Sequence, residues 1–387
     1  MRLANSPTPP LAGSSGGPSL GILSTYPPTA CGLATFSAAL ATGLAANGAE
    51  VSVVRVADGV SPRTERVVGE LVNGSPSSVA ACSDLLNRSD VALVQHEYGL
   101  YGGDDGDEVL QILAGLSVPS IVIAHTVLSS PTPHQRAVLV EVADVADRVV
   151  VMSGAARDRL CGLFDVDPHK IVTIPHGAAV PRRAPHRHDG RPTLLTWGLI
   201  GPGKGIERVV DAMTSLHNLP MPPRYLVAGR THPKVLAQHG EAYREARKAQ
   251  ARGNGVADAV VFDDDYRDVA SLTALIQSSA AVVLPYDSTE QATSGVLVDA
   301  IAAGRPVVAT AFPHAVELLS GGAGIVVDHD DPDAMAVALR RVLTEPGLAA
   351  RMAAEAARLA PSLGWPVVAR AYNGLATHLL TERPVLV

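Results

Sequence analysis

Residues 280–310 constrain the fold of this chain more than any other stretch, because their pattern is strand, polar loop, helix and strand. Residues 280–285 and 306–309 are short apolar runs of the kind that form buried parallel strands. Between them, residues 295–303 are apolar nearly all round, as in a helix covered by its neighbours. The polar loop 286–294 therefore follows a strand and precedes a helix, the place where open α/β sheets bind anionic ligands.

The length of the chain predicts two domains, since 387 residues exceed what one hydrophobic core organises. A net charge of −7 and an aromatic content of 4% argue against nucleic acid as a partner. Cys31, Cys82 and Cys161 are odd in number and widely spaced, so they predict neither a disulfide framework nor a zinc site. This cysteine usage favours a reducing, cytoplasmic location.

Composition divides the chain into five segments. Residues 1–18 are rich in Pro, Ser and Gly and predict a disordered lead-in rather than a signal peptide. Residues 19–180 and 193–360 each alternate strands with helices, which predicts two Rossmann-like domains. Residues 181–192 form a hinge linker rich in arginine and proline, and residues 361–387 predict a terminal helical segment.

Two loops of the first domain follow predicted strands and carry candidate site residues. After the strand at residues 19–24, a loop with Gly32 leads into a helix, which makes a generic phosphate-accepting turn or a plain connection. After the strand at residues 119–124 comes His125. A lone histidine is more often structural than functional, but this one ends a central strand at the edge where a cleft is expected.

A third loop follows the strand predicted at residues 90–95 and begins with His96, Glu97 and Tyr98. Its position favours the crevice, but His96 and Glu97 could also satisfy each other and the nearby backbone. Residues 102–107 predict either a mobile acidic loop or, the favoured alternative, a solvated turn.

In the second domain, the strand at residues 193–197 is followed by a glycine-rich loop and a helix. Gly198 and Gly203 permit close backbone approach to a ligand, and Lys204 can place a point charge against a diphosphate. The spacing is not that of a Walker loop. Arg230, just after the strand at residues 225–229, is either a second cation at the same edge or an ordinary exposed side chain.

These residues carry a resemblance to the family 4 retaining glycosyltransferases. In that family one acidic residue opens the loop after the strand and a second stands eight positions on; here these positions hold Gln291 and Asp299. The glycine-rich loop resembles the family's Gly-Arg…Lys-Gly element, with Lys204 as its lysine and Leu199 in place of its arginine. Further matches in spacing and type are Ser294-Gly295 and Gly304-Arg305-Pro306.

The resemblance implies an α/β GT-B fold, with parallel sheets facing each other across a cleft. It implies an acceptor domain at the amino terminus, a nucleotide-sugar donor domain, and a terminal segment that returns to the first domain. Its roles by residue are as follows: His125, Lys204 and Gln291 in catalysis; Gly32, Gly198, Gly203, Lys204, Arg230, Ser294, Gly295 and Asp299 in donor binding; and His96, Glu97 and Tyr98 on the acceptor side.

The implied reaction moves a hexose, with retention, from a nucleotide sugar of the GDP-mannose or UDP-glucose class to a carbohydrate or lipid-linked acceptor. No cofactor or metal is expected, and Asp263, Asp264 and Asp265 match the loop beside the base rather than a metal motif. Peripheral contact with the inner face of the membrane stays open. Two alternatives remain: a non-catalytic nucleotide-sugar-binding protein, favoured by Leu199 and Gln291, and a GT-B sugar-nucleotide epimerase.

Overall fold

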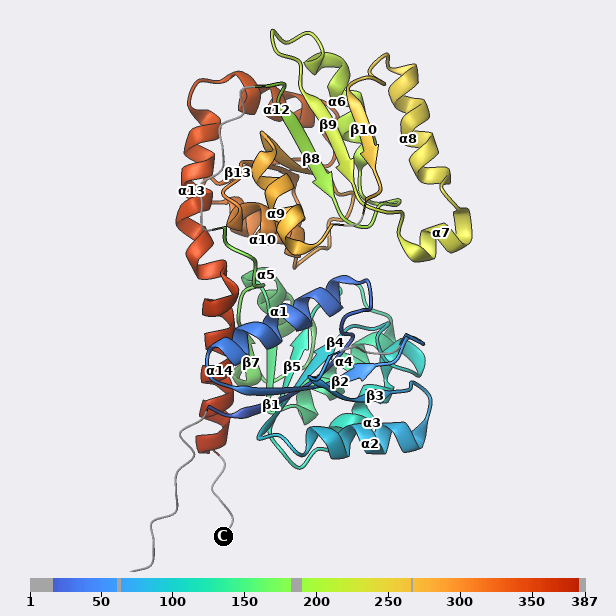
Figure 1. The fold of residues 1–387 in the computed structure, drawn as a ribbon, viewed down its shortest axis with the longest axis vertical. Helices are drawn as coiled ribbons and strands as arrows, with labels where there is room; N and C mark the ends of the chain where they lie inside the picture. Colours follow the sequence, from blue (N-terminus) through green and yellow to red (C-terminus); the bar gives the residue numbers. More distant parts are fainter. Residues whose placement is uncertain (1–16, 61–63, 182–189, 266, 383–387) are drawn as a thin grey trace, which may run out of the picture.

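The computed structural model describes residues 17–60, 64–181, 190–265 and 267–382. Two α/β domains lie one above the other along the long axis of the molecule (Figure 1), each built around a parallel sheet. The predicted fold class is confirmed. Most of the predicted lead-in at residues 1–18 and of the predicted linker at residues 181–192 lies outside the described residues.

The first sheet has seven strands in the order β3-β2-β1-β4-β5-β6-β7. Its strands are β1 Ser19–Ser24, β2 Glu50–Val56, β3 Val67–Leu71, β4 Val91–His96, β5 Ser120–Ala124, β6 Arg148–Val151 and β7 Ile171–Thr173. The helices of this domain are α1 Gly32–Ala46, α2 Pro76–Leu86, α3 Glu108–Ala114, α4 Pro133–Val145 and α5 Gly154–Leu163, with 3-10 turns at η1 Asp104–Gly106 and η2 Pro168–Lys170.

The second sheet has six strands in the order β10-β9-β8-β11-β12-β13. Its strands are β8 Thr193–Trp197, β9 Arg224–Ala228, β10 Val260–Asp263, β11 Ala281–Leu284, β12 Val307–Thr310 and β13 Gly324–Val327. The helices that follow are α6 Ile206–Leu216, α7 Pro233–His239, α8 Ala242–Gly253, α9 Val269–Ser278, α10 Gly295–Ala302, α11 Pro313–Leu319, α12 Ala334–Thr344, α13 Leu348–Leu363 and α14 Trp365–Glu382.

Helices cover both faces of each sheet, so the central strands are buried and mostly apolar, as their sequences predicted. In the first domain, α1 and α14 bury one face, while α2, α3 and α4 bury the other. In the second domain, α6, α8 and α12 pack on one face, and α9, α10, α11 and α13 pack on the other. None of the described helices is long and apolar enough to cross a membrane.

The chain crosses between the domains twice, and the two crossings are joined to each other. The Ala178 amide donates to the Leu363 carbonyl at 2.8 Å, and the Trp365 amide donates to the Ala178 carbonyl at 3.1 Å. From this point α13 runs along the second domain and α14 along the first (Figure 1), where α14 packs against α1. Gly43 in α1 permits this packing, because a Cβ there would lie 2.7 Å from that of Ala369.

The amino end of α5 forms hydrogen bonds with the second domain. Ser153, its N-cap residue, donates from Oγ to the Ala292 carbonyl at 2.5 Å. The Glu317 carboxylate, from α11, accepts hydrogen bonds from the backbone amides of Gly154 at 2.9 Å and Ala155 at 2.8 Å. A carboxylate at a helix amino end satisfies free N–H groups and is favoured by the helix dipole. The domains therefore share a charge-assisted contact.

Replacing Glu317 should weaken the contact between the domains. We expect Glu317→Gln to lower the free energy of unfolding by about 1–2 kcal/mol, because the neutral amide can accept only one of the two hydrogen bonds that the carboxylate oxygens accept. Urea denaturation measures the loss, and small-angle scattering measures any opening of the domains. Glu345→Gln is the matched control, since Glu345 pairs only with exposed arginines of its own domain. Equal stability of the two variants would contradict a role for Glu317 between the domains.

Candidate active site between the two sheets

Both sheets reverse their strand order at a central pair, and open α/β sheets bind ligands at this switch point. In the first sheet the pair is β1 and β4, and in the second it is β8 and β11. The loops that leave the carboxyl ends of these four strands carry most of the predicted site residues, while His125 follows the neighbouring β5 and Arg230 follows the neighbouring β9. Since the two carboxyl edges face each other (Figure 1), the loops meet between the domains.

The glycine-rich loop after β8 packs tightly against the loop after β11. Gly205 has φ of +61°, and a Cβ there would lie 1.7 Å from the Pro285 carbonyl oxygen, so only glycine fits. The Asp287 amide donates to the Gly203 carbonyl at 3.0 Å. Gly198 has φ of +121° and lies against Gly229 at the end of β9. These glycines fix the backbone that presents Lys204.

Lys204 is positioned by an aromatic ring rather than by an acid. Its ammonium lies 4.4 Å from the ring centre of Tyr286, whose ring stacks on Phe312. Burial lowers the pKa of Lys204. Among the described residues, Lys204 forms no ion pair with a carboxylate. A cation held over a ring in this way is available to an anionic ligand.

The amino end of α10 is the second feature of this edge. Ser294 is its N-cap and accepts from the Leu297 amide at 3.3 Å. The Ser294 amide donates to His314 Nδ1 at 2.8 Å, so the loop is anchored to α11. A Cβ on Gly295 would lie 2.8 Å from Nε2 of His176, which enters from the first domain. The helix start thus faces across the domain boundary.

Asp299 lies one turn into α10 with no partner. Among the described residues its carboxylate accepts no hydrogen bond, and burial raises its pKa to about 7. A carboxylate with free lone pairs at this position can accept from paired hydroxyl groups.

His125 ends β5 on the opposite side of the boundary. Its Nε2 lies 2.5 Å from Gln95 Oε1, and because an amide oxygen accepts, Nε2 donates. Burial, with His176 and His96 as lesser causes, lowers the pKa of His125 to about 3. The ring also packs edge-on against Phe36 at 4.9 Å. His125 is therefore a neutral imidazole in a fixed orientation.

A cavity of about 210 Å³ joins His125 and Gln291 between the domains. Arg159 lines it from α5 and donates to the carbonyls of Val127 and Glu290. The lining residues are His125, Thr126, Val127, Leu128, Arg159, Ser288, Glu290, Gln291, Ala292 and Thr293.

His96 and Glu97 form no hydrogen bond with each other, so the predicted mutual pairing is wrong, whereas the predicted contact with nearby backbone is present for Glu97. Glu97 accepts from Thr126 Oγ1 at 2.6 Å and from the Tyr98 amide at 3.2 Å. His96 is buried, and both its ring nitrogens lack a partner among the described residues. Burial lowers the pKa of His96 to about 4 and raises the pKa of Glu97.

The acidic loop at residues 102–107 is tied to its own domain. Its 3-10 turn η1 holds Asp105, which accepts from His134 Nδ1 at 3.0 Å and from Gln135 Nε2 at 3.1 Å. The buried Glu108 carboxylate accepts from the Gly102 amide at 3.1 Å. These hydrogen bonds fix residues 102–107 in an ordered turn.

Three predicted features lie at the site without a tight contact to it. Gly32 begins α1, and a side chain there would meet open space. Arg230 is exposed and donates to the Asp264 carbonyl at 3.4 Å, which directs it toward the acidic triple. Leu199, in the arginine position of the resemblance, is 37% exposed. Within the acidic triple, Asp263 is ion-paired with Arg267.

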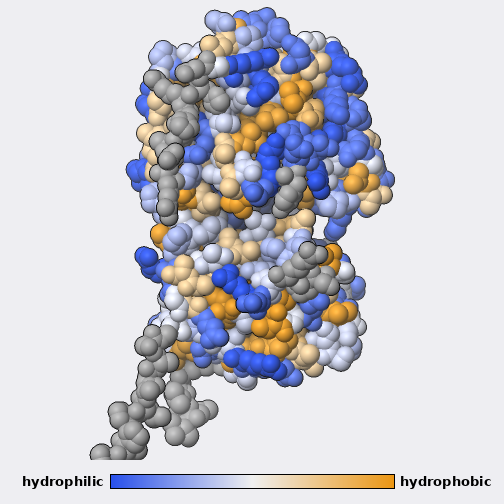
Figure 2. All heavy atoms as spheres, in the orientation of Figure 1, coloured by the Kyte–Doolittle hydropathy of each residue, from blue (hydrophilic) through white to orange (hydrophobic). Residues whose placement is uncertain are grey.

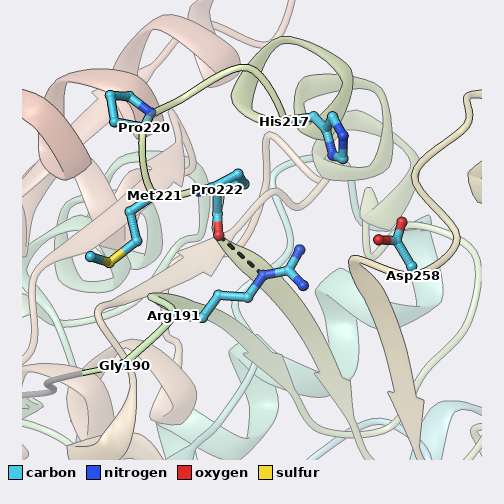
Figure 3. Close-up of a pocket in the computed structure, with 7 residues that line it drawn as sticks. All are labelled: Gly190, Arg191, His217, Pro220, Met221, Pro222 and Asp258. Carbon is cyan, nitrogen blue, oxygen red and sulfur yellow. Dashed lines mark hydrogen bonds between the residues drawn. The ribbon is translucent and has the colours of Figure 1, made fainter.

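A larger hollow of about 480 Å³ lies at the amino-terminal edge of the second sheet (Figure 3), away from these loops. Arg191, which precedes β8, donates from Nε to the Pro222 carbonyl at 3.1 Å. The hollow also borders His217 and Asp258. It lacks the helix amino ends and glycine turns that gather at the opposite edge, so it is not the candidate active site.

Comparison with known proteins identifies the family of the chain. Residues 30–180 match the family model described as Glycosyltransferase Family 4, and residues 191–345 match the one described as Glycosyl transferases group 1. The chain belongs to glycosyltransferase family 4. The predicted membership is confirmed, and the two matched ranges follow the two domains.

Curated relatives of this family 4 chain include two named D-inositol 3-phosphate glycosyltransferase. The protein from Kineococcus radiotolerans is 30% identical over 60% of this chain and 57% of its own length. That from Actinosynnema mirum is 29% identical over 64% of each. The chain thus spans less than two thirds of the length of these relatives.

Solved structures confirm the GT-B arrangement of the family. Sucrose-phosphate synthase from Thermosynechococcus elongatus has a TM-score of 0.76 at 17% identity, over 95% of this chain and 100% of its own. HepE from Anabaena, in complex with UDP and glucose, has a TM-score of 0.72 at 16% identity, over 93% and 100%.

Several residues that shape the candidate site were not predicted from the sequence. Tyr286, Phe36 and Arg159 have no motif that distinguishes them from core or surface residues. His176 stands in a Pro-His-Gly turn, and nothing in the sequence around it indicates that it reaches α10. Such contacts come from domain packing.

The raised pKa of Asp299 predicts a stability that depends on pH. Between about pH 4 and pH 7 the folded chain keeps a proton that the unfolded chain releases, so stability falls as pH rises through this window. Asp299→Asn removes the cost of a buried negative charge. We expect this variant to melt about 2–4 °C above the parent at pH 8, and to lose this advantage by pH 4.5.

Calorimetric melting at the two pH values measures this difference, with the exposed Asp165→Asn as control. If Asp299→Asn changed the melting temperature equally at both pH values, the carboxylate would be ionised throughout and the assignment would be wrong.

Proposed function

We propose that this chain is a retaining glycosyltransferase that moves a hexose from a nucleoside-diphosphate sugar to an acceptor hydroxyl without a metal ion. The observation that carries the proposal is a cation and a carboxylate that have no ionic partner among the described residues, on neighbouring elements at one edge of the second sheet. Lys204 stands in the loop after β8 and Asp299 one turn into α10, and His125 ends β5 in the first domain. Lys204 can bind a diphosphate, Asp299 a ribose and His125 a sugar.

The donor would lie across the carboxyl ends of β8 and β11. Asp299 accepts hydrogen bonds from the ribose hydroxyls. Lys204, the free N–H groups at the start of α10 and the Ser294 hydroxyl stabilise the departing diphosphate. The hexose occupies the cavity beside His125 and Gln291, whose side chains hydrogen-bond its hydroxyls. Gly198 and Gly203 bring the backbone near the nucleotide, and Arg230 is the second cation at this edge.

The chemical step needs no protein nucleophile. The bond from the anomeric carbon to the phosphate oxygen breaks, and the acceptor oxygen attacks from the same face. The departing phosphate takes the acceptor proton. An amide at Gln291 is compatible with this route, because no carboxylate has to attack. His125, neutral and fixed by Gln95, contributes hydrogen bonding rather than proton transfer.

The acceptor would enter from the first domain, between Gly32 and the loop that holds His96, Glu97 and Tyr98. Glu97 is partly buried and can accept from acceptor hydroxyls. The relatives named above act, by their names, on D-inositol 3-phosphate, so that compound belongs in an acceptor panel with sugars and lipid-linked sugars. Structures of HepE with UDP and with UDP-glucose support testing UDP-sugars beside GDP-mannose.

The second candidate function is a nucleotide-sugar-binding protein without catalysis. Leu199 and Gln291, which replace a cation and a carboxylate of the family pattern, favour it. It shares the donor site with the first proposal and differs only in turnover. The turnover of the parent chain in the assay below therefore separates the two functions.

Lys204→Ala and His125→Ala should each lower sugar transfer by about tenfold or more, equivalent to about 1.4 kcal/mol of activation free energy. Lys204 loses its charge on the leaving group, and His125 loses its contact with the sugar. The measurement is release of UDP or GDP in the presence of the acceptor panel, with and without magnesium. Lys248→Ala is the control, because Lys248 pairs only with Glu245 on the surface of α8.

Unchanged turnover in both variants would contradict the assigned site. Nucleotide-sugar binding without turnover in the parent chain would favour the binding protein instead.

A further inference from the structure

His176 of the first domain lies against the amino end of α10. Its ring follows β7 in the turn before the domain crossing. A Cβ placed on Gly295 would lie 2.8 Å from His176 Nε2 and 3.0 Å from Cε1. No side chain fits between them, so this ring requires glycine as the first residue of α10.

The orientation of this ring is fixed by its other nitrogen. His176 Nδ1 lies 2.7 Å from the Gly177 carbonyl oxygen. A carbonyl only accepts, so Nδ1 carries a proton and Nε2 of the neutral ring has a free lone pair. The ring is also packed against Phe36 at 5.0 Å and Trp365 at 6.0 Å between ring centres. Nε2 therefore stays directed toward α10.

The surroundings keep His176 neutral in the free chain. Burial is the main cause that lowers its pKa to about 4, and His314 from α11 lowers it further. His125, at the end of β5, is also in electrostatic contact with it. Phe36 in α1 and Trp365 in α14 bring no charge. The positive end of α10 adds to the cost of protonation while no anion is bound.

A bound diphosphate reverses this balance. Two negative charges within hydrogen-bond distance raise the pKa of an imidazole across the neutral range. In the glycine-rich loop after β8, Leu199 stands where the family has an arginine, and Lys204 is the remaining cation of that loop. The site thus has a neutral, oriented base where a positive charge is needed.

We propose that His176 takes up a proton from solvent when a nucleoside diphosphate occupies the amino end of α10, and then donates from Nε2 to the diphosphate. The resulting imidazolium supplies the positive charge that Leu199 lacks. Because the proton arrives with the ligand, free His176 does not repel the positive end of the helix. This inference rests on the donor site proposed above.

Calorimetric titration tests the proposal. UDP and GDP would be titrated at pH 8 in buffers of different ionisation enthalpy, which reports the protons taken up on binding. We expect His176→Asn to weaken binding by about tenfold and to take up less proton than the parent chain. His169→Asn is the matched control, because His169 is an exposed histidine of the same domain at the opposite end of β7.

Gly295→Ala provides a second variant, in which the His176 side chain is retained. Its Cβ displaces the ring from α10, so binding should weaken and proton uptake should fall as in His176→Asn. Nitrogen-15 spectra of the parent chain give a direct readout. The resonance lost in His176→Asn should move from the neutral to the protonated range when nucleotide is added.

Asp299 has a pKa of about 7, so at pH 8 it is mostly ionised before the nucleotide binds. Any proton that it still releases on binding ribose runs in the opposite direction and is the same in all these variants. Wild-type affinity and proton uptake in His176→Asn would overturn the role of His176 and leave the donor site standing. Failure of the parent chain to bind either nucleotide would overturn both proposals.

Discussion

The parallel direction of every strand pair is the constraint on which the rest of this structure depends. It brings all the loops that follow strands to one edge of each sheet, and the two edges face each other across the domain boundary. Residues far apart in the chain, such as His125 and Gln291, therefore line one cavity. On the face that Figure 2 shows, both domains carry a mixture of hydrophilic and apolar side chains. Among the described residues, three buried polar side chains with atoms that lack a partner, Gln95, His96 and Tyr98, lie at the carboxyl end of β4.

The fold could be predicted closely from the sequence because buried parallel strands are short apolar runs bounded by glycine, proline and polar residues. Strands β1 and β8 begin and end where their patterns predicted. Strand β3 and helix α9 were not predicted: β3 is an edge strand of alternating exposure, and α9 buries little more than Ile276. Elements that contribute few residues to a core leave a weak periodic pattern.

The site was predictable only where backbone geometry dictates residue type. Gly198, Gly203 and Gly205 have positive φ, which the glycine-rich sequence already indicated. Contacts that arise when the domains meet leave no local pattern. The Glu317 carboxylate on the amino end of α5 joins residues more than 160 positions apart, as the bonds to Gly154 and Ala155 show. Sequence analysis found the loops of the site, and only the packed structure shows which side chains turn toward each other.

Side chains of the first domain hold the backbone of a site loop that belongs to the second domain. Loop 288–294 belongs to the second domain, yet Ser153 and Arg159 of α5 hold its carbonyls at Ala292 and Glu290. The first domain thereby fixes the backbone on which Ser294 and Gly295 stand. A displacement of one domain would separate His176 from α10 and His125 from Gln291 together. The geometry of the site therefore depends on the relative position of the two domains. A ligand that binds the assembled site more tightly stabilises this arrangement of the domains by the same free energy.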